Sequence, residues 1–280
     1  MRSTVSPRSN RRLHLRVGQG GLRLRWLAGR RVAHVLGEAE LPWDGTSPLA
    51  DAVATLLARL GGTAPRGAAL EVEIGNALAH FDTVEGTLAG QSDAELAAIA
   101  HACVQEMLGS AHEREVRWQL QADERHLLIC AIERPLLTAL LALADSHGLR
   151  LRSIETSFAL DWNRHGRAVK DGRAVFVSGD EGESVAALVN DGVVQALGTC
   201  AHPDELEEPQ TPTRAVELLC NSVGLEHLAV PTRLDAQVAR MLASLGLDLN
   251  GIERFIAVLA HDDPDSLSSR WTVHAPGAGA

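Results

Sequence analysis

Residues 173–200 read RAVFVSGDEGESVAALVNDGVVQALGTC, and this stretch decides the fold that we expect. It contains three short apolar runs, 175–177, 185–189 and 193–197, which are separated by SGDEGE and by Asn190-Asp191-Gly192. An Asp-Gly pair supplies the positive φ angles of a tight hairpin turn, so the stretch predicts a three-stranded meander. The acidic break between the first two strands contains glycines, and such a break is a common place for a phosphate or metal site.

A similar meander is predicted about 160 residues earlier, in residues 13–37. Strands at 13–17, 22–27 and 32–36 alternate apolar and polar residues, which places their arginines on an exposed face. A loop, a helix (47–60, with Ser47 as its cap and Pro48 in its first turn) and a strand (70–74) follow. After the second meander we expect the same order, with a helix at 214–223 and a strand at 228–230. The sequence therefore predicts a βββαβ unit used twice, although strand meanders are common enough for a chance similarity.

Between the two units lies a region with its own helices and strands. A strand is expected at 78–84, then a helix that opens with a Ser92–Glu95 capping box and ends at Gly109. A hairpin (115–120 and 127–132), a helix (136–146), a strand (149–155) and a short helix (157–163) follow. Beyond the second meander we expect a helix at 234–245 and an apolar run at 252–260 that fits either a strand or a helix.

These elements divide the chain into parts. Residues 1–10 are expected to be a disordered basic tail, and residues 11–172 the first half, with an inserted α+β subdomain at about 76–147. Residues 173–262 form the second half, and residues 263–280 are expected to be a loose tail.

Composition narrows the class of protein. The chain has 280 residues, of which 45% are hydrophobic, so it is globular, and no apolar run approaches the roughly 20 residues that span a bilayer. The four cysteines lack CxxC spacing, which favours reduced thiols in a cytosolic protein over a zinc site. These cysteines are Cys103, Cys130, Cys200 and Cys220.

Charge is unevenly distributed along the chain. Residues 1–31 carry nine arginines and no acid, and the remainder carries 17 bases against 36 acids. The basic end could contact anionic lipid, nucleic acid or an acidic partner, or it could simply be a solubilising terminus with solvent-facing strand positions. A nucleic-acid module is disfavoured, because the body is acidic and aromatic residues make up only 3% of the chain.

The duplicated unit resembles the actin-like ATPase superfamily. The resemblance implies an α/β, actin-like (ribonuclease H-like) fold of two βββαβ halves with an inserted α+β subdomain. Within the superfamily, the segments LLICAIERPLL (127–137), ADSHGL (144–149) and SIETSFAL (153–160) resemble the group of PilM and the GspL cytoplasmic domain. Members of this group are scaffolds on the cytoplasmic side of type IV pilus and type II secretion platforms.

The superfamily has an Asp-x-Gly phosphate loop in the first turn of each half, and this sequence departs from that motif. In the first half the motif falls on Arg16-Val17-Gly18, and an arginine cannot ligate Mg²⁺. In the second half the best strand register places it on Val177-Ser178-Gly179, whereas a shifted register uses Asp180-Glu181-Gly182. The resemblance therefore implies degenerate nucleotide loops, whose candidate residues are Gly18, Gly20, Gly179, Asp180 and Gly182.

Other groups carry weaker signals. Glu71 and Glu73 lie on one face of a strand, which suits acid–base work or, more simply, a wet face. The acidic residues of 204–208 could dock a basic peptide or be a solvated loop. The histidines form no catalytic or metal-binding pattern. We therefore expect no catalytic residues and no metal site.

The resemblance implies a non-catalytic scaffold without a cofactor. It would bind the cytoplasmic tail of an inner-membrane subunit, in a groove between 76–147 and 173–245, and would also self-associate. It would lie in the cytoplasm, with peripheral membrane contact through the Arg-rich amino end and no nucleic acid. The alternatives are an ATP- and Mg²⁺-binding or phosphotransfer enzyme that uses Asp180, and an α/β protein unrelated to the superfamily.

Overall fold

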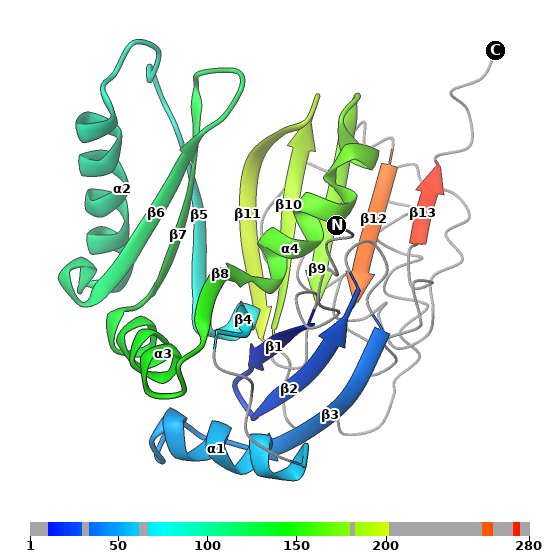
Figure 1. Ribbon diagram of the computed structural model, residues 1–280. Coiled ribbons are helices and arrows are strands. Elements are labelled where there is room, and N and C mark those ends of the chain that lie inside the picture. Colours follow the sequence, from blue (N-terminus) through cyan, green and yellow to red (C-terminus); the bar gives the residue numbers. More distant parts are fainter. Residues whose placement is uncertain are drawn as a thin grey trace, which may run out of the picture.

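The computed structural model describes residues 11–29, 34–61, 67–179, 183–201, 254–259 and 271–274 (Figure 1). The first sheet has the order β3-β2-β1-β4-β8, in which β4 runs parallel to both β1 and β8. Its strands are β1 (Arg11–Val17), β2 (Gly21–Ala28), β3 (His34–Pro42), β4 (Ala69–Ile74) and β8 (Arg150–Thr156). The predicted meander and the strand that returns beside it are therefore present in the first half.

The second sheet repeats this arrangement. Its order is β11-β10-β9-β12-β13, with β12 parallel to β9 and β13 antiparallel to β12. The strands are β9 (Arg173–Gly179), β10 (Glu183–Asn190), β11 (Val193–Ala201), β12 (Arg254–Leu259) and β13 (Trp271–His274). The first four strands have the same lengths as β1, β2, β3 and β4, namely 7, 8, 9 and 6 residues.

The two meanders also share an irregularity in the pairing of their second and third strands. The β2–β3 register shifts between Trp26 and Leu27, and the β10–β11 register shifts between Leu188 and Val189. Both shifts fall at the sixth residue of an eight-residue strand. The predicted hairpin turn is confirmed, because Asp191 and Gly192 have φ angles of 48° and 79°. Two similar sheets are thus present, as the predicted duplication requires.

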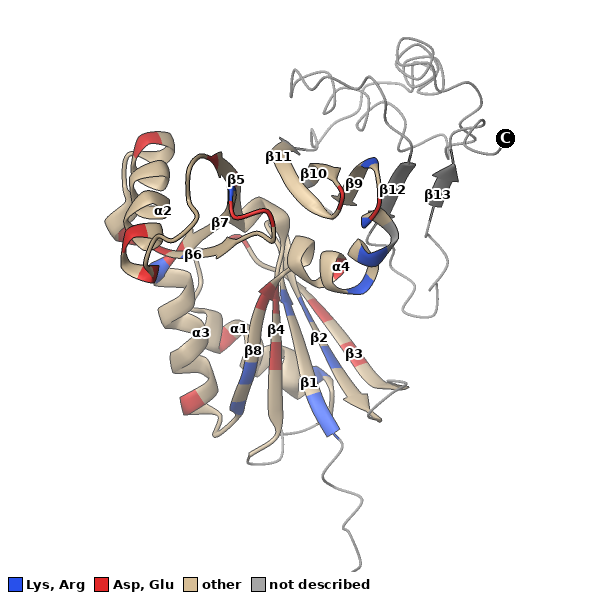
Figure 2. Cartoon of the chain, turned by 90° about the horizontal axis from the view of Figure 1, so that it is seen from above, with Lys and Arg blue, Asp and Glu red and all other residues tan. Residues whose placement is uncertain are grey.

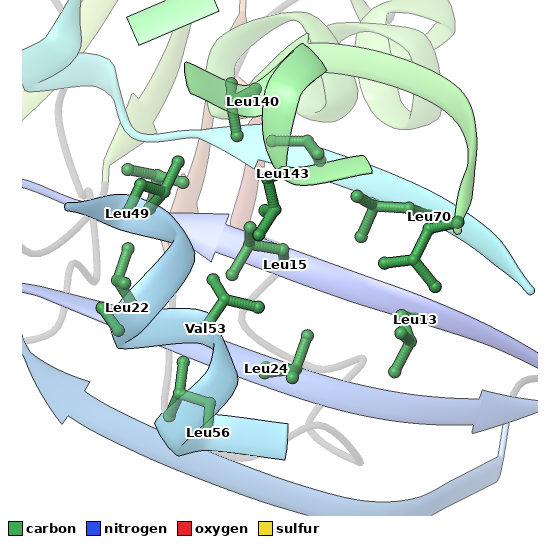
Figure 3. Packing of buried hydrophobic residues seen from close by; sticks show 14 of the residues in the cluster. Leu13, Leu15, Leu22, Leu24, Leu49, Val53, Leu56, Leu70, Leu140 and Leu143 are labelled. Carbon is green, nitrogen blue, oxygen red and sulfur yellow. The ribbon is translucent and has the colours of Figure 1, made fainter. Parts of the chain in front are cut away.

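Helices α1 (Leu49–Arg59) and α3 (Arg134–Ser146) cover one face of the first sheet. Figure 3 shows how side chains from both layers meet: Leu15 of β1 lies beside Leu143 of α3, and Leu24 of β2 lies near Leu56 of α1. Burial of this continuous apolar face is the main favourable term for the first half. The α3 helix was expected inside the inserted subdomain, but its buried residues belong to this core, so the insertion ends at about residue 133.

The inserted subdomain is a three-stranded sheet with one helix. It contains η2 (Asn76–Leu78), β5 (Ala79–Glu85), α2 (Asp93–Leu108), η3 (Ala111–Glu113), β6 (Arg114–Leu120) and β7 (His126–Glu133), with strand order β5-β7-β6. The Ser92–Glu95 capping box and the left-handed Gly109 at the end of α2 are as predicted. Alternate β7 residues, Leu127, Ile129 and Ala131, form a core with α2.

The subdomain is joined to the second half along the edge strand β11, which lies beside β5 in Figure 1. The Gln121 side chain accepts from the Val194 N–H (2.7 Å) and donates to its carbonyl (2.6 Å), and Thr83 Oγ1 donates to the Gln195 carbonyl (3.1 Å). One side-chain amide and one hydroxyl thus satisfy backbone groups of an edge strand. Phe81 and Leu128 also pack on the second-half core. Residues 76–147 and the described residues of 173–245 are therefore in direct contact along β5 and β11, and the groove predicted between these two regions stays a prediction.

The halves are connected through α4 (Ser157–His165) and η4 (Gly166–Val169). The chain has only nine Phe and Trp residues, and four of them meet here. Phe158 of α4 contacts Phe81, Trp162 and Phe176 with ring centroids 5.2–6.3 Å apart, and Trp162 contacts Phe176 at 5.2 Å. This aromatic cluster brings together the subdomain, the connecting helix and β9.

Some expectations are corrected by the structure. Helix α1 has Pro48 rather than Ser47 at its cap, and no side chain caps it. The apolar run at 252–260 contains a strand, β12, and the tail expected to be loose contains β13. The elements predicted at 214–223, 228–230 and 234–245 lie outside the described residues, as do the acidic loop 204–208 and the tail 1–10. None of the helices in the described part of the chain has the length and apolar character that a membrane crossing requires.

Candidate functional site

The strand register fixes which residues stand where the superfamily motif would carry its acid. Val17 ends β1 opposite Ile74, and Gly179 ends β9 opposite Leu259, the last residues of β4 and β12. Residues 18–20 then link β1 to β2, and residues 180–182 link β9 to β10. Arg16 is therefore equivalent to Ser178, rather than to Val177 as the sequence register suggested. Neither position carries a carboxylate.

The turn that contains Gly18 and Gly20 is largely satisfied by the protein itself. The Gly18 N–H donates to the Gly21 carbonyl (2.9 Å), and the Gly20 carbonyl accepts from the Trp43 N–H (3.3 Å). Neither glycine is among those with a positive φ angle, and a Cβ on Gly20 would meet no atom within 4 Å. The geometry therefore does not require glycine at position 20. A pocket of about 490 Å³ adjoins this turn and is lined in part by Arg16 and Arg23.

Gly179 is the buried last residue of β9, whereas Asp180 and Gly182 lie outside the described residues. The hypothesis that uses Asp180 in a shifted register thus stays a prediction. The structure does bring the ends of β1 and β9 to one place. The Gly75 N–H donates to the Val17 carbonyl (2.8 Å), and the next residue, Asn76, contacts Ser178.

Around this contact lies a buried set of polar side chains that we call the polar junction. It consists of Arg16, Glu73, Asn76, Ser157, Asp161 and Ser178, from β1, β4, η2, α4 and β9. The relative exposure of Arg16 is 9%, and Asn76 and Ser178 are fully buried. Polar groups at such depth are stable only when they are paired, so the contacts among them determine what the junction can do.

Asn76, which follows β4 of the first half, bonds both the connecting helix α4 and strand β9 of the second half. Its Nδ2 donates to the Ser178 carbonyl (3.1 Å) in the second half, and its Oδ1 accepts from the Phe158 N–H (2.9 Å) in α4. Ser178 Oγ donates in turn to Asp161 Oδ2 (2.6 Å). One buried amide and one hydroxyl therefore tie the first half and the connecting helix to β9.

Glu73 is held in its ionised form. Burial alone would raise its pKa, but the hydrogen bond and charge of His14, the charge of Arg16 and the hydrogen bond from Ser157 together lower the pKa to about 2. Glu73 Oε2 lies 3.3 Å from His14 Nε2, and Glu73 Oε1 lies 3.7 Å from Arg16 Nε and accepts from Ser157 Oγ (2.8 Å). This carboxylate is already fully engaged with the protein.

Asp161 is in the opposite situation. Burial raises its pKa to about 6, and the nearby Glu73 charge adds to the increase, while the Ser178 hydrogen bond and the charges of Arg164 and Arg16 act against it. Two carboxyl groups with pKa values near 2 and 6 thus lie in one buried site. A pair of this kind is often catalytic, but here both members are bonded to the protein's own side chains.

A nucleotide-bound Mg²⁺ ion does not fit these residues. Mg²⁺ needs oxygen ligands in near-octahedral geometry, whereas the two motif positions present a guanidinium and a hydroxyl that is already donating. Within the described residues, no three His, Cys, Asp or Glu side chains gather where they could share a metal ion. Among the described residues of the junction, both carboxylates and the Ser178 hydroxyl are engaged with the protein's own side chains.

The open face of the first sheet carries columns of charge (Figure 2). The β2 arginines pair with the β3 acids, Arg23 with Glu40 and Arg25 with Glu38 (3.0 Å). On the other side of β1, Glu71 pairs with Arg12 (2.8 Å) and Arg152 (3.0 Å), so it is part of this ionic face and not of an acid–base pair. The arginines expected on an exposed face are thus bound in ion pairs, and Arg16 is buried. Four of the nine arginines of residues 1–31 are used in this way.

The remaining candidates have ordinary roles. Cys103 and Cys130 are free thiols, and burial raises the pKa of each to about 12, which makes both unreactive. His101 bonds the Ala97 carbonyl within α2, and His126 bonds Asp123 in the β6–β7 turn. The residues that sequence reasoning missed are Asn76 and Asp161. Their only signal was a polar side chain beside the apolar runs of β4 and α4.

Comparison with solved structures shows the fold. No protein-family model and no curated protein matches the sequence. A protein from Bacteroides thetaiotaomicron with an actin-like ATPase fold and unknown function is 12% identical, covering 93% of this chain and 94% of its own, with a TM-score of 0.52. A chain of the PilM–PilN type IV pilus biogenesis complex is 14% identical over 84% of this chain and 70% of its own, with a TM-score of 0.50.

The cytoplasmic domain of EpsL, an inner membrane component of the type II secretion system of Vibrio cholerae, is 9% identical over 79% of each chain, with a TM-score of 0.46. The first two structures show that the chain has an actin-like ATPase fold. The predicted fold class, α/β with duplicated halves, is confirmed.

Proposed function

We propose that the chain is a non-catalytic actin-like scaffold. It would serve on the cytoplasmic side of an inner-membrane platform of the type IV pilus or type II secretion kind, where it binds the cytoplasmic tail of a membrane subunit. The observation that supports this most is the identity of the two motif positions. Arg16 and Ser178 replace the acids, and both side chains are bonded within the polar junction.

The loss of those acids argues against hydrolysis. Phosphoryl transfer depends on metal ions that neutralise charge on the phosphates and on a group that orients the attacking water. A buried guanidinium supplies one positive charge but no metal ligand, and the hydroxyl of Ser178 is engaged with Asp161. A protein that keeps the fold without these groups is better suited to binding than to turnover.

The choice of partner rests on fold and charge. PilM has this fold and occurs in a complex with PilN, which motivates a membrane subunit as the partner. Cytoplasmic segments next to a membrane span are rich in Lys and Arg, and such a tail suits a chain with a net charge of −10. Self-association and a peripheral contact through the Arg-rich amino end are further parts of this proposal.

Fluorescence polarisation tests the scaffold function directly. Labelled peptides with the sequences of the cytoplasmic tails of inner-membrane pilus and secretion subunits are titrated with the full chain, and scrambled peptides of equal charge are the controls. We expect saturable binding of at least one native tail and none of its scrambled form. If every tail binds no better than its scrambled control, the scaffold proposal fails.

The pocket of about 490 Å³ beside Arg16 and the glycine turn keeps a second candidate, ATP binding or phosphotransfer, open to test. Isothermal titration calorimetry with Mg-ATP separates the two functions. We expect no heat of binding in the micromolar range. Binding that disappears in Asp180→Ala would instead support the enzyme.

A further inference from the structure

We infer that the Arg16 guanidinium is the resident cation of the polar junction, and that it keeps the two halves together without a nucleotide-bound metal ion. The inference concerns how the halves are held and does not depend on which partner the protein binds. It begins from the disagreement between the fold, which in the superfamily surrounds a metal–nucleotide complex, and the residues found at this position.

The first step is the charge of the site. Glu73 comes from β4 and Asp161 from α4, and each is mostly buried, so their mutual repulsion is poorly screened. A buried pair of acids needs a cation or a shared proton to be tolerated. Arg16 lies on β1, next to β4, with Nε 3.7 Å from Glu73 Oε1. His14 acts on Glu73 more strongly and Arg164 acts on Asp161 more strongly, but the charge of Arg16 favours the ionised form of both acids.

The second step is what these acids hold. Glu73 accepts from Ser157 at the start of α4, and Asp161, one helical turn later, accepts from Ser178 of β9. The path from β1 to β9 therefore runs through Arg16, the two carboxylates and Ser178. Asn76 adds a second path, which carries no charge, from η2 to the same residue of β9. Neutralising the acids thus stabilises the contacts that join the halves.

The third step is the nature of the cation. A guanidinium stays protonated at any physiological pH and is covalently part of the chain, so it cannot dissociate as a metal–nucleotide complex does. A fixed cation favours one permanent arrangement of the two halves. An exchangeable cation would instead let the halves alternate between an arrangement with the cation bound and one without it. The aromatic cluster of α4 and β9 packs beside the same joint and limits its movement.

Replacing Arg16 by an acid tests this directly. Arg16→Asp would place a third carboxylate beside Glu73 and Asp161, so we expect the melting temperature of the full chain to fall by about 5–10 °C. Three carboxylates form a site for a divalent cation, so 10 mM MgCl₂ should restore much of the loss, whereas NaCl of equal ionic strength should not. The wild type should be indifferent to MgCl₂.

Arg16→Gln keeps the inference testable if the aspartate variant does not fold. We expect the backbone amides of α4 and β9 to exchange hydrogen about tenfold faster than in the wild type, because the two acids lose the cation that they share. Arg25→Gln is the matched control, since Arg25 lies on the same sheet face but pairs with Glu38, away from the junction. Unchanged exchange in Arg16→Gln would overturn the inference, and so would a wild type that MgCl₂ stabilises as strongly as it does Arg16→Asp.

Discussion

The two meanders have the same backbone and opposite surfaces. On the face toward α4, β1 and β2 of the first half present Arg12, His14, Arg16, Arg23 and Arg25, whereas the equivalent residues of the second half are Ala174, Phe176, Ser178, Val185 and Ala187. The arginine-rich set forms ion pairs on an open sheet, and the other set is buried with the aromatic cluster. The two meanders therefore have the same strand lengths and register although one face is charged in the first half and mainly apolar in the second.

The difference shows where the second half gains its stability. Both faces of β9 are buried, so nearly every residue of this strand contributes apolar area, whereas β1 contributes on one face only. In the first half, the polar face of the sheet is stabilised instead by ion pairs among its own side chains. The four predictions that follow exchange or remove residues at matched positions, and they run from the largest expected effect to the smallest.

The largest effect is expected when a charge from the first half is placed at the matched position in the second. Val185→Arg would bury an unpaired guanidinium, which should cost more than about 4 kcal/mol and abolish cooperative folding of the chain. The reverse change, Arg23→Val, removes ion pairs with the partly exposed acids Glu38 and Glu40 and should cost about 1 kcal/mol or less. Urea denaturation followed by circular dichroism measures both. Similar losses of unfolding free energy in the two variants would show that the two sheet faces do not differ in how they tolerate a charge.

A truncation at a matched pair gives the next largest effect. Phe176→Ala removes a fully buried ring from the aromatic cluster and should lower the free energy of unfolding by about 3–5 kcal/mol. His14→Ala, at the equivalent residue of β1, should lower it by about 1 kcal/mol, because its contact with Glu73 is partly solvated. Guanidinium denaturation measures both losses of unfolding free energy, and their ratio compares how much each face contributes to stability. A larger loss for His14→Ala would contradict it.

The link between the halves should respond to removal of Asn76. Asn76→Ala leaves the buried Phe158 N–H and the Ser178 carbonyl without this partner, which should cost about 2–4 kcal/mol in unfolding free energy. Gln91→Ala is a suitable control, because Gln91 has the same kind of amide in an exposed turn. If thermal denaturation gives equal melting temperatures for the two variants, Asn76 does not join the halves as described.

The smallest effect concerns the pH dependence of stability. The folded-state pKa of Asp161 is raised to about 6, so the folded protein takes up a proton between pH 6 and pH 4 that the unfolded chain still lacks. Stability should therefore increase by about 1 kcal/mol when the pH falls from 7.5 to 5. Glu73, whose pKa is about 2, loses its contribution only at lower pH.

Asp161→Asn tests this assignment. An amide at position 161 can still accept from Ser178 but does not titrate, so the variant should be more stable than the wild type at pH 7.5 and should lose the pH dependence between 7.5 and 5. The charged groups that act on Asp161 are Glu73, Arg164 and Arg16, and the substitution changes none of them. Chemical denaturation at the two pH values is the measurement. A pH dependence that persists in the variant would assign it to another group.

Much of the fold could be predicted from local rules. The Asp191-Gly192 turn, the Ser92–Glu95 capping box and the alternation of β1 and β2 are each determined by a few neighbouring residues. The two meanders followed from these, whereas the helix and strand expected at 214–223 and 228–230 lie outside the described residues. The α3 helix was placed in the wrong unit, because amphipathic spacing predicts that a helix has a buried face but not which sheet buries it.

The polar junction could not be predicted in the same way. Alternation made Arg16 look exposed, since a polar residue on one face of a strand usually faces solvent, and only the placement of α4 and β9 buries it. Asn76 acquires its role from Ser178, which is 102 residues away in the sequence. The equivalence of Arg16 and Ser178, one residue away from the register that the sequence suggested, follows from the pairing of β9 with β10 and β12.

The shared register shift at Trp26/Leu27 and Leu188/Val189 bears on the history of the chain. Regular strands and tight turns arise wherever physics favours them, so their presence in both halves says little about descent. The extra residues themselves have different surroundings, because Leu36 of β3 is exposed whereas the Gln195 carbonyl of β11 accepts from Thr83 Oγ1. A shared contact therefore does not explain why both strands have an extra residue at the same place, and independent origins would seldom produce it twice. We take it as an inherited irregularity, which indicates that one ancestral half was copied and fused before its two descendants acquired opposite surfaces.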